Sequence, residues 1–220
     1  MPIPSNFSSP TRISAKERAF SQIQEWIIDG TLQPQEKLTD ADLAKALGVS
    51  RTPIREALQL LNVHGFVEMF PGVGTQVTEV KPEDISKILP PLGVLQALAA
   101  ELAAPDINQQ SIDLLREVNK KFAKALKAGD TFTALKQDEK FHNIIIDLAQ
   151  NSYISNTVSM LQAHVMRLYY NKTIILKERS INEHEEMLKA FEQRNKEKAG
   201  QIARTNWLRA IDEYYSEEKL

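Results

Sequence analysis

The segment TDADLAKALGVSRTPIREALQLLNVHGF, residues 39–66, decides the fold of the first part of the chain. Apolar residues recur at helical spacing in two short stretches, one on each side of Gly48. A glycine tolerates the positive φ with which many helices end, and Ser50 follows at a position suited to capping the next helix. Two amphipathic helices joined by so tight a turn predict a helix-turn-helix.

The polar residues at the start of the second predicted helix indicate what this motif binds. Ser50, Arg51, Thr52 and Arg55 lie away from its apolar stripe. Free N–H groups, hydroxyls and two guanidinium groups suit phosphate binding and the reading of guanine in the major groove of DNA. The alternative is an ordinary capped surface helix with solvated arginines, but the combination of all four residues favours DNA binding.

A short hairpin is expected directly after this motif. Val67 to Phe70 reads as a strand, Pro71 to Gly74 as a turn, and Thr75 to about Val80 as a returning strand rich in β-branched residues. Such a hairpin makes the motif a winged helix-turn-helix. Gly72 at its tip would allow close approach to the DNA backbone or minor groove, although a purely structural hairpin is also possible.

Length and composition fit a soluble protein of two domains, and the pattern of predicted elements predicts a mainly α fold. The chain has 220 residues and no cysteine, which is compatible with a reducing cytoplasm, and no apolar run was found near the roughly twenty residues that cross a bilayer. Its net charge of −2 means that DNA affinity must come from a local patch and from two copies acting together. We expect a flexible polar arm at 1–15, a winged helix-turn-helix at 16–79 and an all-α domain at 80–220.

The second domain is predicted to be a run of helices, with Pro90 and Pro91 breaking or kinking the first. By position and by elimination, this bundle is the part that senses a ligand or forms the dimer. The predicted helices span about 83–104, 109–128, 130–149, 153–171, 179–194 and 196–216.

One group of residues in the bundle could bind a metal ion. Asp138 and His142 are four residues apart, so they share a helix face that also carries apolar residues, and His184 lies on another apolar stripe. Buried polar groups need partners, and a divalent ion bound by all three would satisfy them together. A self-sufficient, hydrogen-bonded Asp–His pair in the core is the competing interpretation.

The first part of the chain resembles a known family. The sequence LTDADLAKALGVSRTPIREALQLLNVHGFVEMFPGVGTQV, residues 38–77, resembles the winged-helix domain of GntR-type bacterial transcription regulators, and the match extends upstream through residues 23–38. The resemblance implies that the four polar residues at the start of the second helix, together with Gly72, contact operator DNA. Ala41 departs from the pattern, because many members carry an arginine there, which puts the usual operator sequence in doubt.

The second part resembles the FadR-like subfamily of these regulators, whose C-terminal domain is of the FCD type. DxxFH, ending at His142, and EHxxML, beginning at Glu183, carry the resemblance. It implies that an Asp and three His bind a metal, commonly zinc or nickel. The third His falls at Asn206, whose amide oxygen is a weaker ligand, so we expect Asp138, His142, His184 and Asn206 to form a site of lowered affinity.

The resemblance also implies a ligand and a mode of action. In that branch the metal binds an organic acid through its carboxylate, and an arginine helps, but Gly93 and Gln96 occupy the matching positions here. Arg167 is the best replacement, unless it is merely a surface arginine. We therefore expect a cytoplasmic homodimer, a repressor by default, that binds palindromic operator DNA and responds to a small carboxylic acid, with no membrane partner.

Two other classes of protein remain as alternatives: a metal-dependent hydrolase-like enzyme and an architectural DNA binder without an effector. No HExxH motif, nucleophile elbow, glycine-rich phosphate loop or dinucleotide-binding fingerprint supports an enzyme. An architectural DNA binder would need neither the inward polar cluster nor a separate sensing domain.

Overall fold

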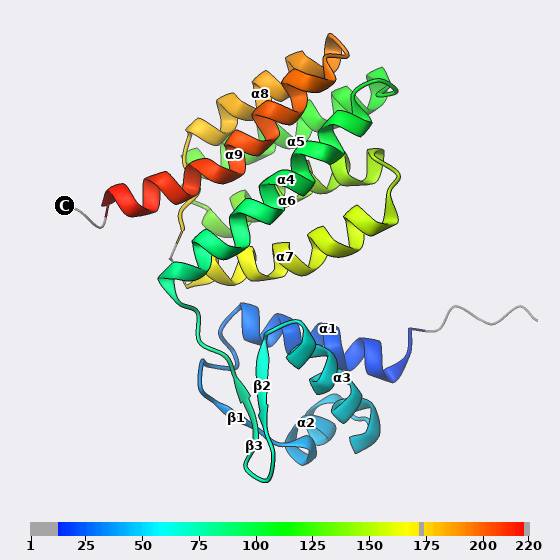
Figure 1. The fold of residues 1–220 in the computed structure, drawn as a ribbon, viewed down its shortest axis with the longest axis vertical. Helices are drawn as coiled ribbons and strands as arrows, with labels where there is room; N and C mark the ends of the chain where they lie inside the picture. Colours follow the sequence, from blue (N-terminus) through cyan, green and yellow to red (C-terminus); the bar gives the residue numbers. More distant parts are fainter. Residues whose placement is uncertain (1–12, 172–173, 218–220) are drawn as a thin grey trace, which may run out of the picture. The chain divides into compact units, whose positions relative to one another are not determined.

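The computed structural model describes residues 13–171 and 174–217. It confirms the predicted fold class, a winged helix-turn-helix followed by an all-helical bundle (Figure 1). The chain divides into two compact units between Glu79 and Val80. Most of the predicted N-terminal arm, residues 1–12, lies outside the described residues.

The first unit packs three helices against a small sheet. Helices α1 and α3 form its core, in which Ile23, Ile54, Leu58 and Leu61 are fully buried. In chain order its elements are α1 (Ala15–Ile28), β1 (Lys37–Leu38), α2 (Asp40–Leu47), α3 (Arg51–Val63), β2 (Val67–Phe70) and β3 (Gly74–Val77).

Local sequence explains where the two helices of the motif begin and end. The Thr39 hydroxyl accepts a hydrogen bond from the backbone N–H of Asp42 at 3.2 Å and so caps α2. Gly48 ends α2 with φ at +63°, the left-handed conformation expected there. The next helix can therefore start only three residues later, which keeps the turn of the motif tight.

The sheet has the order β1–β3–β2, and both pairings are antiparallel. Val67 pairs with Val77, and Phe70 pairs with Gly74 at the end of the hairpin, where Gly72 has φ at +73°. β3 is shorter than the predicted returning strand, and β1 was not predicted. A two-residue strand has no periodicity that a sequence could reveal.

The second unit is a bundle of six α-helices within the described residues, preceded by the 3₁₀ turn η1 (Pro82–Asp84). Each helix boundary lies within two residues of its prediction. The helices are α4 (Ile85–Ala103), α5 (Gln109–Lys127), α6 (Thr131–Leu148), α7 (Ser152–Tyr170), α8 (Arg179–Glu192) and α9 (Lys196–Glu217).

Helix α4 differs from the sequence prediction in two respects. It runs without a break through Pro90 and Pro91, although neither can donate a helical hydrogen bond; both are flanked by the fully buried Leu89 and Leu92. The expectation that no apolar run could cross a membrane is also wrong, since α4 is long and apolar enough by length and composition. Its composition has a local explanation: α4 packs against α6, α7 and, most extensively, α9.

Candidate DNA-binding surface and metal centre

The start of α3 exposes all four residues that were predicted to bind DNA. Ser50 is the N-cap residue by backbone conformation, yet its side chain makes no capping hydrogen bond. Arg51, Thr52 and Arg55 are exposed as well. The buried stripe of α3 fixes the helix in its unit, so this polar end is presented to solvent on a rigid support.

One of these residues is held in place by the preceding helix. The Arg55 guanidinium donates through Nε to the Asp40 carboxylate at the start of α2. Such a contact limits the directions in which the guanidinium can point and leaves its Nη groups available for DNA. Ala41, beside Asp40, is exposed but offers no polar group in place of the family's arginine.

The hairpin presents a surface without cationic side chains. Gly72 is exposed at its tip, and Met69, Phe70 and Val73 are exposed apolar residues around it. Residues 66–78 contain no Lys or Arg. The hairpin therefore offers only its backbone and apolar or uncharged polar groups, whereas positive charge must come from other parts of the unit, such as the start of α3.

The predicted metal ligands come together inside the helical unit. Asp138 and His142 extend from α6, His184 from α8 and Asn206 from α9, and all four are buried. One donor atom each of Asp138, His142 and His184 lies within 4.8 Å of the others. Neither imidazole is hydrogen-bonded to Asp138: the Nε2–carboxylate distances are 3.6 Å from His184 and 4.0 Å from His142.

These separations fit a metal ion better than a self-sufficient hydrogen-bonded pair. Two ligand atoms of a tetrahedral zinc ion are about 3.4 Å apart, from ligand distances of about 2.1 Å. Nε2 of His184 and Nδ1 of His142 are buried without a hydrogen-bond partner among the described residues. Unpartnered buried nitrogens are costly, and an ion at Nε2 of His184 would satisfy one of them.

The orientation of His184 also suits a metal ligand. Its Nδ1 lies 3.0 Å from Oδ1 of Asn119, while Nδ2 of Asn119 donates to Glu185 and to the Ile181 carbonyl. Oδ1 of Asn119 must then accept from Nδ1–H of His184, which leaves a lone pair on Nε2. The Phe141 ring stacks on the imidazole at a centroid distance of 4.0 Å and fixes its plane.

Burial also sets the protonation of the two histidines. It lowers the pKa of His142 to about 3, against a hydrogen bond that the imidazole donates to the Asn206 side chain and that raises it. Burial, with the nearby His142 and Arg209, holds the pKa of His184 well below its usual value. Both imidazoles are therefore neutral, as metal ligands must be.

The pKa of the carboxyl group in the cluster is shifted upward, in the opposite direction to the histidines. Burial raises the pKa of Asp138 to about 7; the charge of Arg209 opposes this shift, and Glu139 and Glu183 add to it. A divalent ion beside Asp138 would favour its ionised form.

A small cavity adjoins the cluster and is lined by Asp138, Asn206, Tyr169, Ser180 and Arg209, among others. It provides about 20 Å³ for water-sized groups, room for about one water molecule. The lining includes Arg209 and not Arg167.

Arg167 is buried on α7, where burial lowers its pKa to about 10 against the opposing charge of Asp84. Its role toward an effector stays a prediction.

Sequence reasoning missed three polar residues of this site: Asn119, Glu183 and Arg209. Asn119 and Glu183 lie beside apolar stripes of their helices, and Arg209 follows Asn206 by three, so each shares a face with core residues. That signal was available in the sequence. Their partners were not, because each contact joins two different helices.

Comparison with known proteins identifies the family. The family model described as "Bacterial regulatory proteins, gntR family" matches residues 15–77, and the FCD domain model matches residues 92–207, more than half of the chain. The chain belongs to the GntR family and carries an FCD domain. It is therefore a bacterial DNA-binding transcriptional regulator of the helix-turn-helix type.

Relatives of this GntR-family chain are regulators and not enzymes. LutR of Bacillus subtilis (strain 168), an HTH-type transcriptional regulator, is 30% identical over 189 residues, which cover 74% of this chain and 84% of LutR. The uncharacterized regulator YdhC of the same organism is 28% identical over 185 residues, 83% of each chain. The solved structure of E. coli McbR/YncC shares the fold, with a TM-score of 0.76 at 22% identity, and the match covers 94% of this chain and 100% of that one.

Proposed function

We propose that this GntR-family regulator binds palindromic operator DNA as a homodimer in the cytoplasm and represses transcription. Each copy would place the start of α3 in a major groove, with Ser50, Arg51, Thr52 and Arg55 toward the bases and phosphates and Gly72 of the hairpin toward the backbone or minor groove. The observation that carries this proposal is that Ser50, beside the exposed Arg51 and Thr52, makes no capping hydrogen bond with its side chain. A structural cap would use the serine hydroxyl, whereas here it is available to a ligand.

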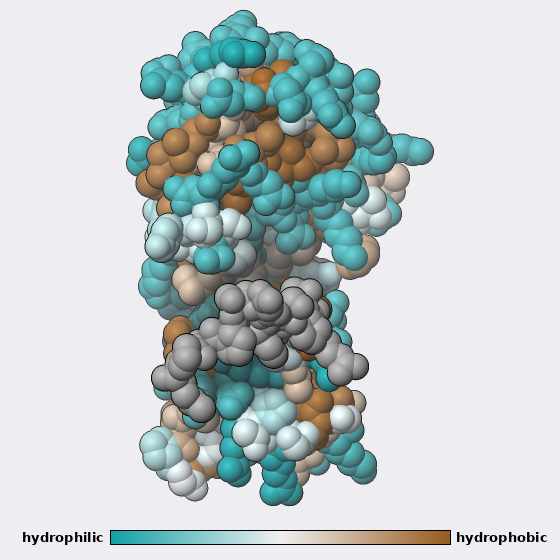
Figure 2. All heavy atoms as spheres, turned by 90° about the vertical axis from the view of Figure 1, so that its right-hand side faces the viewer, coloured by the Kyte–Doolittle hydropathy of each residue, from teal (hydrophilic) through white to brown (hydrophobic). Residues whose placement is uncertain are grey.

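An apolar strip on the helical unit supports dimerisation. Val94, Leu98 and Leu102 of α4 are each 41–49% exposed and follow one another at four-residue spacing, so they form one stripe. Figure 2 shows hydrophobic side chains gathered in a band across one face of this unit. Contiguous exposed apolar surface is typical of an interface, and a second copy would also double the weak DNA contacts of one chain.

We propose further that Asp138, His142, His184 and Asn206 hold a divalent metal, with zinc and nickel the ions implied by the family. A bound ion with an open coordination position supplies a Lewis acid to which a carboxylate can bind. The chain's own residues hold the ion, exclude water around it and orient His184 through Asn119.

The effector proposed for this site is a small carboxylic acid. The cavity beside the cluster has room for about one water molecule, so an organic acid must move the surrounding helices apart to enter. Binding would then favour a second conformation of the helical unit, which is the requirement for control of DNA affinity. Arg167 stays the cation predicted from sequence for the acid's carboxylate, and Arg209, which lines the cavity, is a second candidate.

One experiment tests these proposals together. Full-length protein, purified without chelator, is used to enrich binding sites from a random DNA pool, and its metal content is measured by mass spectrometry. We expect a palindromic site protected by a dimer, about one divalent ion per chain, and weaker DNA binding when small carboxylic acids are added. The absence of any enriched site would refute the DNA-binding proposal, and a metal-free protein would refute the metal centre.

A further inference from the structure

The amide group of Asn206 has a fixed orientation. Its Nδ2 donates to Oε2 of Glu183 at 2.8 Å, and both side chains are buried. A carboxylate can only accept hydrogen bonds, so the amide nitrogen must face Glu183 and Oδ1 must face the opposite way. On that side lies His142, with which the Asn206 side chain also forms a hydrogen bond.

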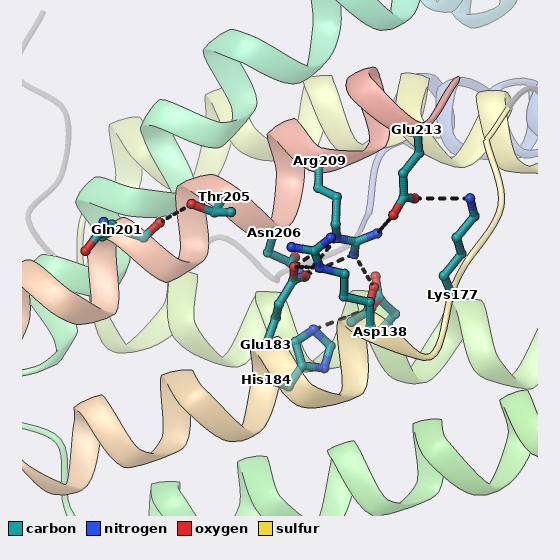
Figure 3. Close-up of polar contacts among 11 residues, drawn as sticks. Asp138, Lys177, Glu183, His184, Gln201, Thr205, Asn206, Arg209 and Glu213 are labelled. Carbon is teal, nitrogen blue, oxygen red and sulfur yellow. Dashed lines mark hydrogen bonds and ion pairs between the residues drawn. The ribbon is translucent and has the colours of Figure 1, made fainter. Parts of the chain in front are cut away.

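Glu183 is in turn held by a buried arginine on α9. Nε of Arg209 lies 2.9 Å from Oε1 of Glu183, and Nη2 lies 2.9 Å from Oε2, so both carboxylate oxygens are engaged. Ser180 and Glu213 accept the remaining bonds of the guanidinium at 2.8 Å each. Figure 3 shows these side chains converging beside Asp138 and His184.

Fold stability alone is a poor explanation for this network. Burying an ion pair costs about as much desolvation energy as the attraction returns, so such a pair adds little to stability. It does confer geometric specificity, because the two-pronged Arg209 contact leaves Glu183 one position. Asn206 is the member of the network that is also a proposed metal ligand, and the orientation of its amide is the property that the network determines.

We propose that Glu183, locked by Arg209, is a positioning residue that presents Oδ1 of Asn206 as the fourth donor of the metal centre. This inference rests on the proposed metal site and adds its donor set: two oxygens, from Asp138 and Asn206, and two imidazole nitrogens. Replacing an imidazole by an oxygen donor favours harder ions such as Mn²⁺ relative to Zn²⁺ or Ni²⁺. The ion selectivity of this chain therefore differs from that of a site with three histidines.

The first test changes Glu183 without changing its size. In Glu183→Gln the new amide can donate as well as accept, so it no longer dictates the orientation of Asn206. Full-length protein is freed of metal and titrated with Mn²⁺, Co²⁺ and Zn²⁺ separately. We expect each dissociation constant to rise about 10- to 100-fold, the usual effect of losing an outer partner of a ligand, and the visible spectrum of the Co²⁺ form to change. Glu186→Gln, an exposed change on the same helix, is the matched control and should alter neither.

The second test reverses the hydrogen bond. In the double variant Glu183→Gln with Asn206→Asp, the glutamine donates and the new carboxylate accepts, so an oxygen again faces the ion. We expect this variant to recover the metal affinity that Glu183→Gln alone loses. Asn206→His is the complementary change, and it should raise the preference for Zn²⁺ over Mn²⁺ at least about 10-fold.

The outcomes separate this inference from the proposed function. If the parent protein binds none of the three ions, the metal centre itself is refuted. If the parent binds them and Glu183→Gln leaves the constants and the Co²⁺ spectrum unchanged, the positioning role is refuted while the metal centre stands. If Glu183→Gln does not fold, as judged by circular dichroism, Asn206→His decides: an unchanged preference between Zn²⁺ and Mn²⁺ refutes the oxygen donor.

Discussion

Replacing Arg51 by alanine should weaken operator binding strongly while leaving the fold intact. Arg51 is the first residue of α3 and is exposed, so its loss should change the free energy of unfolding by no more than about 0.5 kcal/mol. A bidentate arginine–base contact contributes about 1–3 kcal/mol of discrimination. Two copies in a dimer double this to about 2–6 kcal/mol, which corresponds to a loss of affinity between about 30-fold and more than 10⁴-fold.

The assay can also show which part of the DNA Arg51 contacts. Affinities of parent and variant for the enriched operator are measured by fluorescence anisotropy over a range of salt concentrations. If Arg51 contacts phosphates, affinity should fall on all sequences and the salt slope should drop by about one per copy. If it reads a base, the variant should lose the preference at that position with less change in slope.

Lys120→Ala provides a control with the same change of charge. Lys120 is exposed on α5 in the helical unit, so its removal tests whether net charge alone affects binding. We expect the control to bind DNA as the parent does. Operator affinity of Arg51→Ala within twofold of the parent would show that the start of α3 does not read DNA, and the functional assignment of that surface would be wrong.

The remaining predictions concern the metal centre and local stability. His142→Ala combined with His184→Ala should abolish bound metal, measured by mass spectrometry on protein that circular dichroism shows to be folded; full metal content would place the ion elsewhere. Removing metal from the parent with a chelator should lower its thermal midpoint, by an amount equivalent to about 2.7 kcal/mol if the ion had been present at 100 times its dissociation constant. Ser50→Ala should weaken DNA binding with little loss of stability, because the Ser50 hydroxyl makes no capping hydrogen bond. Thr39→Ala should destabilise the protein by about 1 kcal/mol, because the Thr39 hydroxyl caps α2. Equal effects of the two variants on thermal unfolding would contradict this distinction. Gly48→Ala should cost about 1 kcal/mol in chemical denaturation because its φ is +63°.

Much of the fold could be predicted because local signals repeat along the chain. The helices of the second unit are long and strongly periodic, and turn residues such as Gly129 and Asn151 mark where they end or begin. β1 could not be predicted, since Lys37 and Leu38 form a strand only through pairing with β3. The continuity of α4 through Pro90 and Pro91 could not be predicted, because the local cost of a proline inside a helix can be outweighed by packing of its neighbours, here Leu89 and Leu92.

The candidate ligands of the site could be predicted from the sequence, but the residues that hydrogen-bond to them and hold them in place could not. Asp138 and His142 share one helix face, so four-residue spacing brings them together without knowledge of the fold. His184 was added to them because it lies on an apolar stripe of its own helix. Asn206 needed the family pattern, because its position depends on how α9 packs in the bundle. Glu183 shares a helix face with core residues, but its charge alone would assign it to the surface. Its burial follows from Arg209, 26 residues away, and such a pairing arises only in three dimensions.

The packing of α4 against α9 has a consequence for biosynthesis. The first unit is compact and has its own buried core, so it can fold while the ribosome is still translating the helical unit. Helix α4 leaves the exit tunnel soon afterwards, but its main partner is the last helix of the described chain. At a synthesis rate of about 5–20 residues per second, α4, the most apolar of the described helices, is exposed for several seconds before α9 is synthesised. Chaperones that bind apolar segments therefore have a defined target and a defined interval in which to act.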